Sequence, residues 1–109
     1  MRLIQLYRGD ELDIEYRTKK LEKVCTNAYE AQKAYGSEMA EKIHQRIDQI
    51  DAADSVDQMI QFKIGRCHPL VGNREGQFAM DLKHPYRLVF EKTESETKIV
   101  RIEQIEDYH

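Results

Sequence analysis

The chain has 109 residues, of which 40% are hydrophobic, and this size and composition fit one domain around one core. Its formal net charge of −3 argues against a protein that binds nucleic acid over its whole surface, because phosphate affinity comes from clustered Lys and Arg. The sequence has neither an apolar run near the ~18 residues of a membrane helix nor a recognisable signal peptide, so we expect a cytoplasmic protein without membrane attachment.

The first half of the chain has helical periodicity after one short strand. Residues 12–17 alternate apolar and charged side chains, which indicates a half-buried strand. Residues 1–10 form an extension before it, either an extra edge strand or a disordered tail. Apolar residues recur at helical spacing over residues 18–35, as one long helix or two short ones, and again over residues 37–50. We expect a helical hairpin, followed by a short helical turn at residues 54–60.

The second half of the chain is predicted to form strands. From Gly65 onward the helical period disappears, and Gly, Asn and Pro mark turns. Apolar and polar side chains alternate over residues 78–82 and 86–90, which predicts a hairpin, and a last strand follows over residues 98–105. The order strand, helices, strands indicates an α+β domain, with the helical hairpin on one face of an antiparallel sheet of about four to five strands. The other face is expected to be open.

The charge is unevenly distributed along the chain. Residues 60–90 contain five basic and two acidic residues, a local charge of +3, whereas the segments before and after each carry −3. A site for an anionic substrate is therefore expected in this middle segment. Strand alternation also places Arg87 on the open face of the sheet if its neighbours Tyr86 and Leu88 point toward the helices. A solvated basic face is the alternative interpretation.

Two groups of residues have side chains suited to proton transfer. His68 follows the helical half and precedes Pro69, and an imidazole can give or take a proton without a metal. The segment Glu106-Asp107-Tyr108-His109 combines carboxylates, a phenol and an imidazole directly after the last strand. Cleavage of RNA by its own 2′-hydroxyl needs a base, an acid and cations at the phosphate, and such residues can supply them. The alternatives are a structural histidine and a frayed polar tail.

Neither a metal site nor a disulfide is predicted. Cys25 and Cys67 lie 42 positions apart without a CxxC spacing, which is typical of reduced thiols rather than of a disulfide framework. A site drawn from Cys67, His68, Asp107 and His109 matches no known ligand spacing. We therefore expect no metal and no other cofactor.

Three separated segments resemble HigB-type toxins of the RelE superfamily. They are His68-Pro69-Leu70-Val71-Gly72-Asn73-Arg74-Glu75-Gly76-Gln77-Phe78, Tyr86-Arg87-Leu88-Val89-Phe90 and Glu106-Asp107-Tyr108-His109, and the likeness extends more loosely over residues 12–109. The resemblance implies a RelE-like fold and a ribosome-dependent endoribonuclease that cuts mRNA. It also implies a HigA-like antitoxin with a helix-turn-helix domain, so that DNA is contacted only indirectly, through the antitoxin.

The resemblance also assigns roles to individual residues. His68 and His109 are implied as general acid and base in an unassigned order, and Arg87 as the cation at the scissile phosphate. Asp107 is implied to orient an imidazole, and Tyr108 to position substrate or relay a proton. The surrounding RNA contacts are expected from the basic residues of the middle segment, namely Lys63, Arg66, Arg74 and Lys83.

Two positions depart from the pattern of the family. Val71 stands where the family commonly has Lys, and Asn73 where it commonly has Asp. One cation near the phosphate is therefore missing, and loss of one such contact lowers a rate by roughly 10² to 10³. A non-catalytic protein on the same fold, either a ParE-like gyrase inhibitor or a decayed toxin that binds an antitoxin, is the alternative function.

Overall fold

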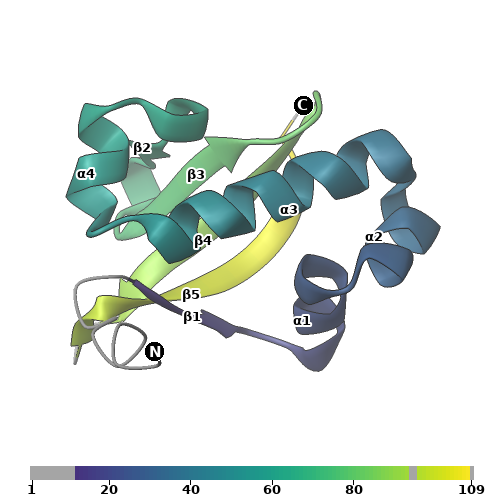
Figure 1. Cartoon of the computed structure of the whole chain (residues 1–109). Helices are drawn as coiled ribbons and strands as arrows, with labels where there is room; N and C mark the ends of the chain where they lie inside the picture. The colour runs from purple at the N-terminus through teal and green to yellow at the C-terminus, as the bar shows by residue number, and fades with distance from the viewer. Residues whose placement is uncertain (1–11, 94–95, 109) are drawn as a thin grey trace, which may run out of the picture.

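The computed structural model describes residues 12–93 and 96–108. In this part of the chain one short strand precedes the helices, and the remaining strands follow them (Figure 1). The helices are α1 (Lys19–Thr26), α2 (Ala28–Tyr35), α3 (Ser37–Ala52) and α4 (Val56–Gln61). The strands are β1 (Asp13–Tyr16), β2 (His68–Pro69), β3 (Gln77–Asp81), β4 (Tyr86–Thr93) and β5 (Glu96–Asp107). Two 3₁₀ turns, η2 (Ile64–Arg66) and η3 (Gly72–Arg74), flank β2. The predicted extension at residues 1–10 lies outside the described residues.

The sheet has the strand order β1-β5-β4-β3-β2 and is mixed. Strands β2 to β5 pair antiparallel, as the sequence predicts, whereas β1 pairs parallel with β5, with Ile14 opposite Val100. The expectation of a wholly antiparallel sheet is therefore wrong for β1. A parallel neighbour needs a crossover connection in place of a hairpin, and the helices and the other strands lie between β1 and β5 in the chain. The α+β class is confirmed.

Side-chain caps set the boundaries of the short helices. Thr18 Oγ1 accepts a hydrogen bond from the Leu21 N–H at 3.1 Å, at the start of α1. Asn27 Oδ1 accepts one from the Glu30 N–H at 3.0 Å, which ends α1 and begins α2. Gly36 then separates α2 from α3 with φ +85°, a conformation that favours glycine. The periodic segment before residue 36 is thus two short helices, one of the two arrangements that its pattern allows.

The core lies between the helices and one face of the sheet. Helix α3 crosses that face (Figure 1), and its Ile43 and Ile50 are fully buried in one cluster with Leu88, Phe90 and Ile102 of the sheet. The apolar spacing of α3 therefore corresponds to the face it buries. Among the described residues, no helix has both the length and the apolar character needed to cross a membrane.

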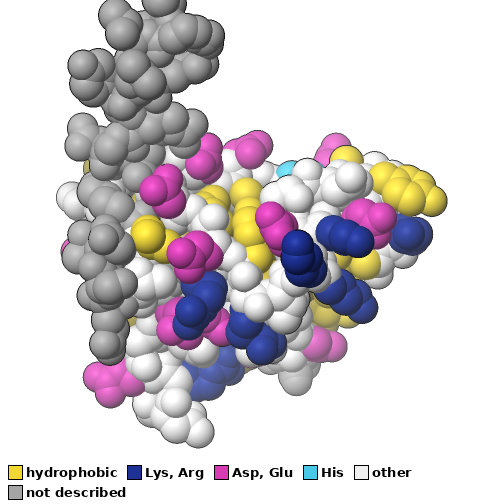
Figure 2. Space-filling view, turned by 90° about the horizontal axis from the view of Figure 1, so that it is seen from below, with side chains coloured by type: hydrophobic (Ala, Val, Ile, Leu, Met, Phe, Trp, Pro, Cys, Tyr) yellow, Lys and Arg dark blue, Asp and Glu magenta, His cyan; other side chains and the backbone are white. Residues whose placement is uncertain are grey.

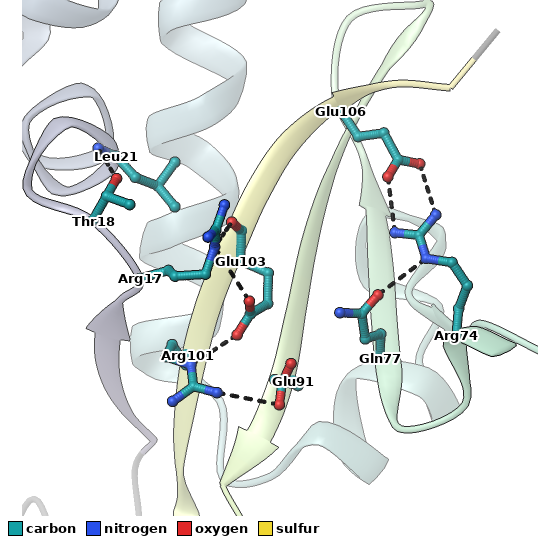
Figure 3. Close-up of polar contacts among 9 residues, drawn as sticks. All are labelled: Arg17, Thr18, Leu21, Arg74, Gln77, Glu91, Arg101, Glu103 and Glu106. Atoms are coloured by element: carbon teal, nitrogen blue, oxygen red, sulfur yellow. Dashed lines mark hydrogen bonds and ion pairs between the residues drawn. The ribbon is translucent and has the colours of Figure 1, made fainter.

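The second face of the sheet carries charged side chains, and the core lies on the other face. Leu88 and Phe90 join the core, so strand alternation places Arg87 and Val89 on the second face, as expected. Both are nevertheless buried, with exposed fractions of 6% and 0%. Glu106 and Tyr108 cover Arg87. Figure 3 shows the arginines and carboxylates that pair on this face, namely Arg17, Arg74, Glu91, Arg101, Glu103 and Glu106.

Candidate active site

Three strands bring charged side chains into one row. Asp81 of β3 is opposite Arg87 of β4, and Arg87 is opposite Glu106 of β5. Directly opposite residues on one face have Cβ atoms about 4.5–5.5 Å apart, so the row is formed by the strand register. Arg87 at its centre is the cation that the sequence predicts for the scissile phosphate.

Arg87 is held by the Glu106 carboxylate. Its Nε donates a hydrogen bond to Glu106 Oε2 at 2.9 Å, and its Nη2 lies 2.7 Å from the same oxygen. Arg74, from η3, reaches the same carboxylate with Nη2 at 2.8 Å from Oε1 and Nη1 at 3.3 Å from Oε2. Hydrogen bonds from Arg74, and next from Arg87, hold the pKa of Glu106 below its ordinary 4.5, although burial acts in the opposite direction. Glu106 is therefore an ionised partner of two arginines at neutral pH.

Tyr108 covers the face of the Arg87 guanidinium. The Arg87 Cζ lies 3.6 Å from the centroid of the Tyr108 ring, in cation–π geometry. The backbone N–H of Tyr108 donates to the Pro85 carbonyl at 2.9 Å, and Asp107 is paired with Tyr86 at the end of β5. The alternative of a frayed tail is therefore wrong for residues 107 and 108. His109 lies outside the described residues.

His68 is placed by β2 and by the turn before it. It pairs with Ala79 of β3, and its Nδ1 lies 2.7 Å from the Arg66 carbonyl oxygen. A carbonyl oxygen only accepts hydrogen bonds, so Nδ1 carries the proton and Nε2 is the nitrogen available for proton transfer in the neutral ring. The turn thus fixes both the tautomer and the orientation of this imidazole.

Arg66 links His68 to the row of charged residues, because its carbonyl accepts from His68 Nδ1 and its guanidinium binds Asp81. The two nitrogens of this guanidinium lie 2.7 and 2.9 Å from the Asp81 carboxylate oxygens. These hydrogen bonds are the main cause that lowers the pKa of Asp81 from 3.8, and the charges of Arg66, His68 and Arg46 act in the same direction. His68, Arg66 and Asp81 therefore form a second cluster beside Arg87.

Arg46 of α3 supports this cluster from the core side. It is 9% exposed, and its Nε donates to the Asp81 carbonyl at 2.7 Å. Gly65 in η2 makes room for it, because a Cβ at Gly65 would lie 2.7 Å from Arg46 Nε. The sequence does not predict Arg46 and Asp81 as site residues, and it places Glu106 in the candidate C-terminal segment without a role. The sequence contains a signal for Arg46, because this basic residue lies between Ile43 and Ile47 at the edge of the apolar face of α3.

Two hollows adjoin the Arg87–Glu106 pair. The first, about 690 Å³, is lined by Arg87 together with Arg66, Asp81, Leu82, His84, Pro85, Tyr86 and Tyr108. The second, also about 690 Å³, is lined on the charged face by residues that include Arg74, Gln77, Gln104 and Glu106. The pair lies between them, since Arg87 lines one hollow and Glu106 the other.

The other predicted cations are placed differently. Arg66 and Arg74 are brought into the site. Lys83 instead pairs with Glu38 at 3.2 Å, and Lys63 is an exposed residue before η2; neither lines the two hollows. Val71 is 82% exposed beside η3. On the face shown in Figure 2, Lys and Arg side chains are interspersed with Asp and Glu side chains and form no uniformly basic surface.

Metal binding has no support in the described residues. Within residues 12–93 and 96–108, no three His, Cys, Asp or Glu side chains lie close enough together to hold a metal ion. Cys25 and Cys67 are both buried without a disulfide, and burial raises the pKa of each thiol to about 12. The described side chains of the site carry imidazole, phenol, carboxylate and guanidinium groups.

The fold matches solved structures of toxins. One chain of a YoeB-YefM complex from Staphylococcus aureus is 21% identical with a TM-score of 0.59, and the match covers 91% of this chain and 98% of that one. A YoeB/ParE toxin from Agrobacterium tumefaciens is 15% identical with a TM-score of 0.62, over 90% and 100%. A YafQ variant from E. coli is 20% identical with a TM-score of 0.51, over 89% and 93%. No family model and no curated protein matches the sequence. The RelE-like fold that the resemblance implies is therefore confirmed.

Proposed function

We propose that this chain is the toxin of a type II toxin-antitoxin pair and that it cleaves mRNA on the ribosome. The observation that carries the proposal is the packing of Arg87 under Tyr108 beside the His68 cluster. Sequence motifs predict these three residues, which come from β2, β4 and the position after β5. Solved structures of a YoeB/ParE toxin and of a YoeB-YefM toxin-antitoxin complex give the fold-level support.

The proposed reaction is cleavage by the 2′-hydroxyl of the substrate. This hydroxyl attacks phosphorus and passes its proton to a base, while an acid protonates the departing 5′-oxygen; the products are a 2′,3′-cyclic phosphate and a 5′-hydroxyl. We assign one of the two proton transfers to Nε2 of His68 and the other to His109. Tyr108 positions the substrate and Asp107 orients an imidazole. Arg87 stabilises the charge that develops on the phosphate.

The electrostatics of the site support dependence on the ribosome. Arg87 and Arg74 are paired with Glu106, and Arg66 is paired with Asp81. Since free RNA affinity scales with unpaired cations, the isolated protein is expected to bind RNA weakly. A ribosome that holds the mRNA in place removes this requirement. In the proposed complex Lys63, Arg66, Arg74 and Lys83 contact RNA.

The proposed partner is an antitoxin, and the proposed compartment is the cytoplasm. Structural neighbours were solved as complexes of YoeB with YefM. The sequence motifs of this chain instead resemble HigB-type toxins, so we propose a HigA-like helix-turn-helix antitoxin for it, through which DNA is contacted. This choice predicts that a neighbouring reading frame encodes a helix-turn-helix protein. A YefM-like protein encoded there contradicts it.

A non-catalytic function is the second candidate. It is favoured by the burial of Arg87 and by Val71 in place of the usual Lys. The two forms of this candidate are a ParE-like gyrase inhibitor and a decayed toxin that binds an antitoxin. A gyrase inhibitor is expected to inhibit growth and a decayed toxin is not, and in both cases His68→Ala leaves the result unchanged. A gyrase supercoiling assay distinguishes the two forms.

Mapping of RNA ends after induction in a bacterial host tests the proposal. The wild type is expected to produce new ends within coding sequences, and His68→Ala, Tyr108→Ala and His109→Ala are expected to abolish or greatly reduce them. Tyr29→Ala is the matched control, because Tyr29 is as exposed as Tyr108, at 67% against 61%, and also contacts a cation, Lys33. Absence of new ends in the wild type, or unchanged ends in the three site variants, contradicts the proposal.

A further inference from the structure

Glu106 occupies a position that suits a phosphate. Its carboxylate takes the fork of Arg74 on both oxygens, at 2.8 and 3.3 Å, and two nitrogens of Arg87 on Oε2, at 2.9 and 2.7 Å. Planar guanidinium groups that converge on one anion are the arrangement proteins use for carboxylate and phosphate alike. The free protein therefore supplies its own anion to both arginines; Figure 3 shows the contact with Arg74.

Arg87 has little surface through which another anion can reach it. Its side chain is 7% exposed, because Glu106 lies along its edge and the Tyr108 ring covers its face. Arg74, on the other side of the carboxylate, is 31% exposed. A phosphate that binds Arg87 must therefore displace one of its two covers. Displacement of Glu106 is the route that also releases Arg74.

We propose that Glu106 is a positioning residue that holds Arg74 and Arg87 in place in the free protein. An RNA phosphate displaces its carboxylate from both arginines, so RNA competes with Glu106 for the site. This inference rests on the proposed function and names the contact that regulates it. With Glu106 in place the three side chains carry a net charge of +1; without it the two arginines present +2 to the incoming phosphate.

Two further contacts support competition over a purely structural role. The Arg74 Nε donates to Gln77 Oε1 at 3.1 Å, which keeps Arg74 in position when the carboxylate leaves. The pairing of β4 with β5 is supplied by the backbone ladder on both sides of Arg87 and Glu106. The Arg87–Glu106 pair lies between the two hollows.

Binding of RNA that cannot be cut tests the inference. The probe is a single-stranded oligonucleotide with 2′-methoxy groups, which lacks the attacking hydroxyl, and the Kd is measured at several salt concentrations. Glu106→Gln keeps the shape and removes the charge. It is expected to bind about 10-fold more tightly, the equivalent of one charged hydrogen bond, with a salt slope steeper by about 0.7. Glu103→Gln is the matched control, because Glu103 pairs with Arg101 on the same face, is about as buried as Glu106 and lines neither hollow.

The inference is overturned if Glu106→Gln binds no more tightly than the wild type, if Glu103→Gln gains as much, or if no variant binds the probe. A second measurement uses the wild type alone. On addition of the probe, the NMR signals of the Nε–H groups of Arg74 and Arg87 are expected to shift together, and signals that stay unchanged at saturation contradict the proposal. If Glu106→Gln binds the probe more tightly but the wild type cleaves no mRNA, the proposed nuclease function is wrong and the proposed competition between Glu106 and RNA stands.

Discussion

Gly65 is the residue whose substitution tests how the site is assembled. It has φ +58°, and a Cβ there would lie 2.7 Å from Arg46 Nε. Arg46 is not free to move away, because its Nε donates to the Asp81 carbonyl at 2.7 Å and its Nη1 to Gln49 at 2.9 Å. Gly65→Ala should therefore disturb the support of Asp81 from the core side.

The expected loss can be worked out from these contacts. A left-handed backbone costs a residue with a side chain about 1 kcal/mol, and a lost hydrogen bond from a charged group about 1.5–3 kcal/mol. Gly65→Ala should lower the free energy of unfolding by ~2.5–4 kcal/mol, or the Tm by ~10–16 °C. Gly72→Ala is the control, since Gly72 has φ +71° but no heavy atom within 4 Å of its Cβ. It should lose about 1 kcal/mol.

The measurement is urea unfolding followed by circular dichroism in four variants. With Arg46→Ala in the background the side-chain atoms that obstruct a Cβ are gone, so Gly65→Ala should then cost no more than Gly72→Ala. Such coupling is expected of residues in contact. The prediction fails if Gly65→Ala costs no more than Gly72→Ala in the wild type, or if its cost is the same with Ala at position 46.

Two more predictions follow from the pKa shifts. Burial raises the pKa of Cys25 and Cys67 to about 12, so a thiol reagent at pH 8 should label neither in the folded protein and both in urea; fast labelling of the folded protein contradicts their burial. The pKa values of Glu106 and Asp81 are lowered from 4.5 and 3.8, so the stability they contribute is complete above about pH 5 and is lost as the pH falls through the folded values. Unfolding measured from pH 6 to pH 3 should therefore show a smaller acid loss in Glu106→Gln than in the wild type, and equal losses contradict the prediction.

Local patterns predicted most of the elements. The alternation in residues 78–82 and 86–90 gives β3 and β4, because one face of each strand is buried against the helices. The direction of β1 was not predictable in this way, since alternation has no direction and no turn connects β1 to β5. A side-chain cap at Asn27 explains why one periodic segment is two helices.

The candidate site was predictable only in part. Alternation placed Arg87 on the second face, and motifs selected Tyr108 and His68. The burial of Arg87 was not predictable, because its cover depends on Arg74 and Glu106, which lie 32 positions apart in the chain. Such pairs leave no periodic signal in the sequence, and an acidic residue near a strand end is ordinarily predicted to be exposed to solvent. Sequence patterns therefore identify Arg87 as the cation of the site but do not identify Glu106 as the carboxylate that neutralises it.

Cleavage of a defined mRNA on purified ribosomes tests the central claim most directly. The purified wild type should cut the mRNA of a programmed ribosome and leave the same mRNA intact without ribosomes. Arg87→Gln should reduce the cut by at least roughly 10², whereas Arg101→Gln, an arginine of the same face outside the two hollows, should cut normally. An uncut mRNA with the wild type, or equal cutting by Arg87→Gln, contradicts the account.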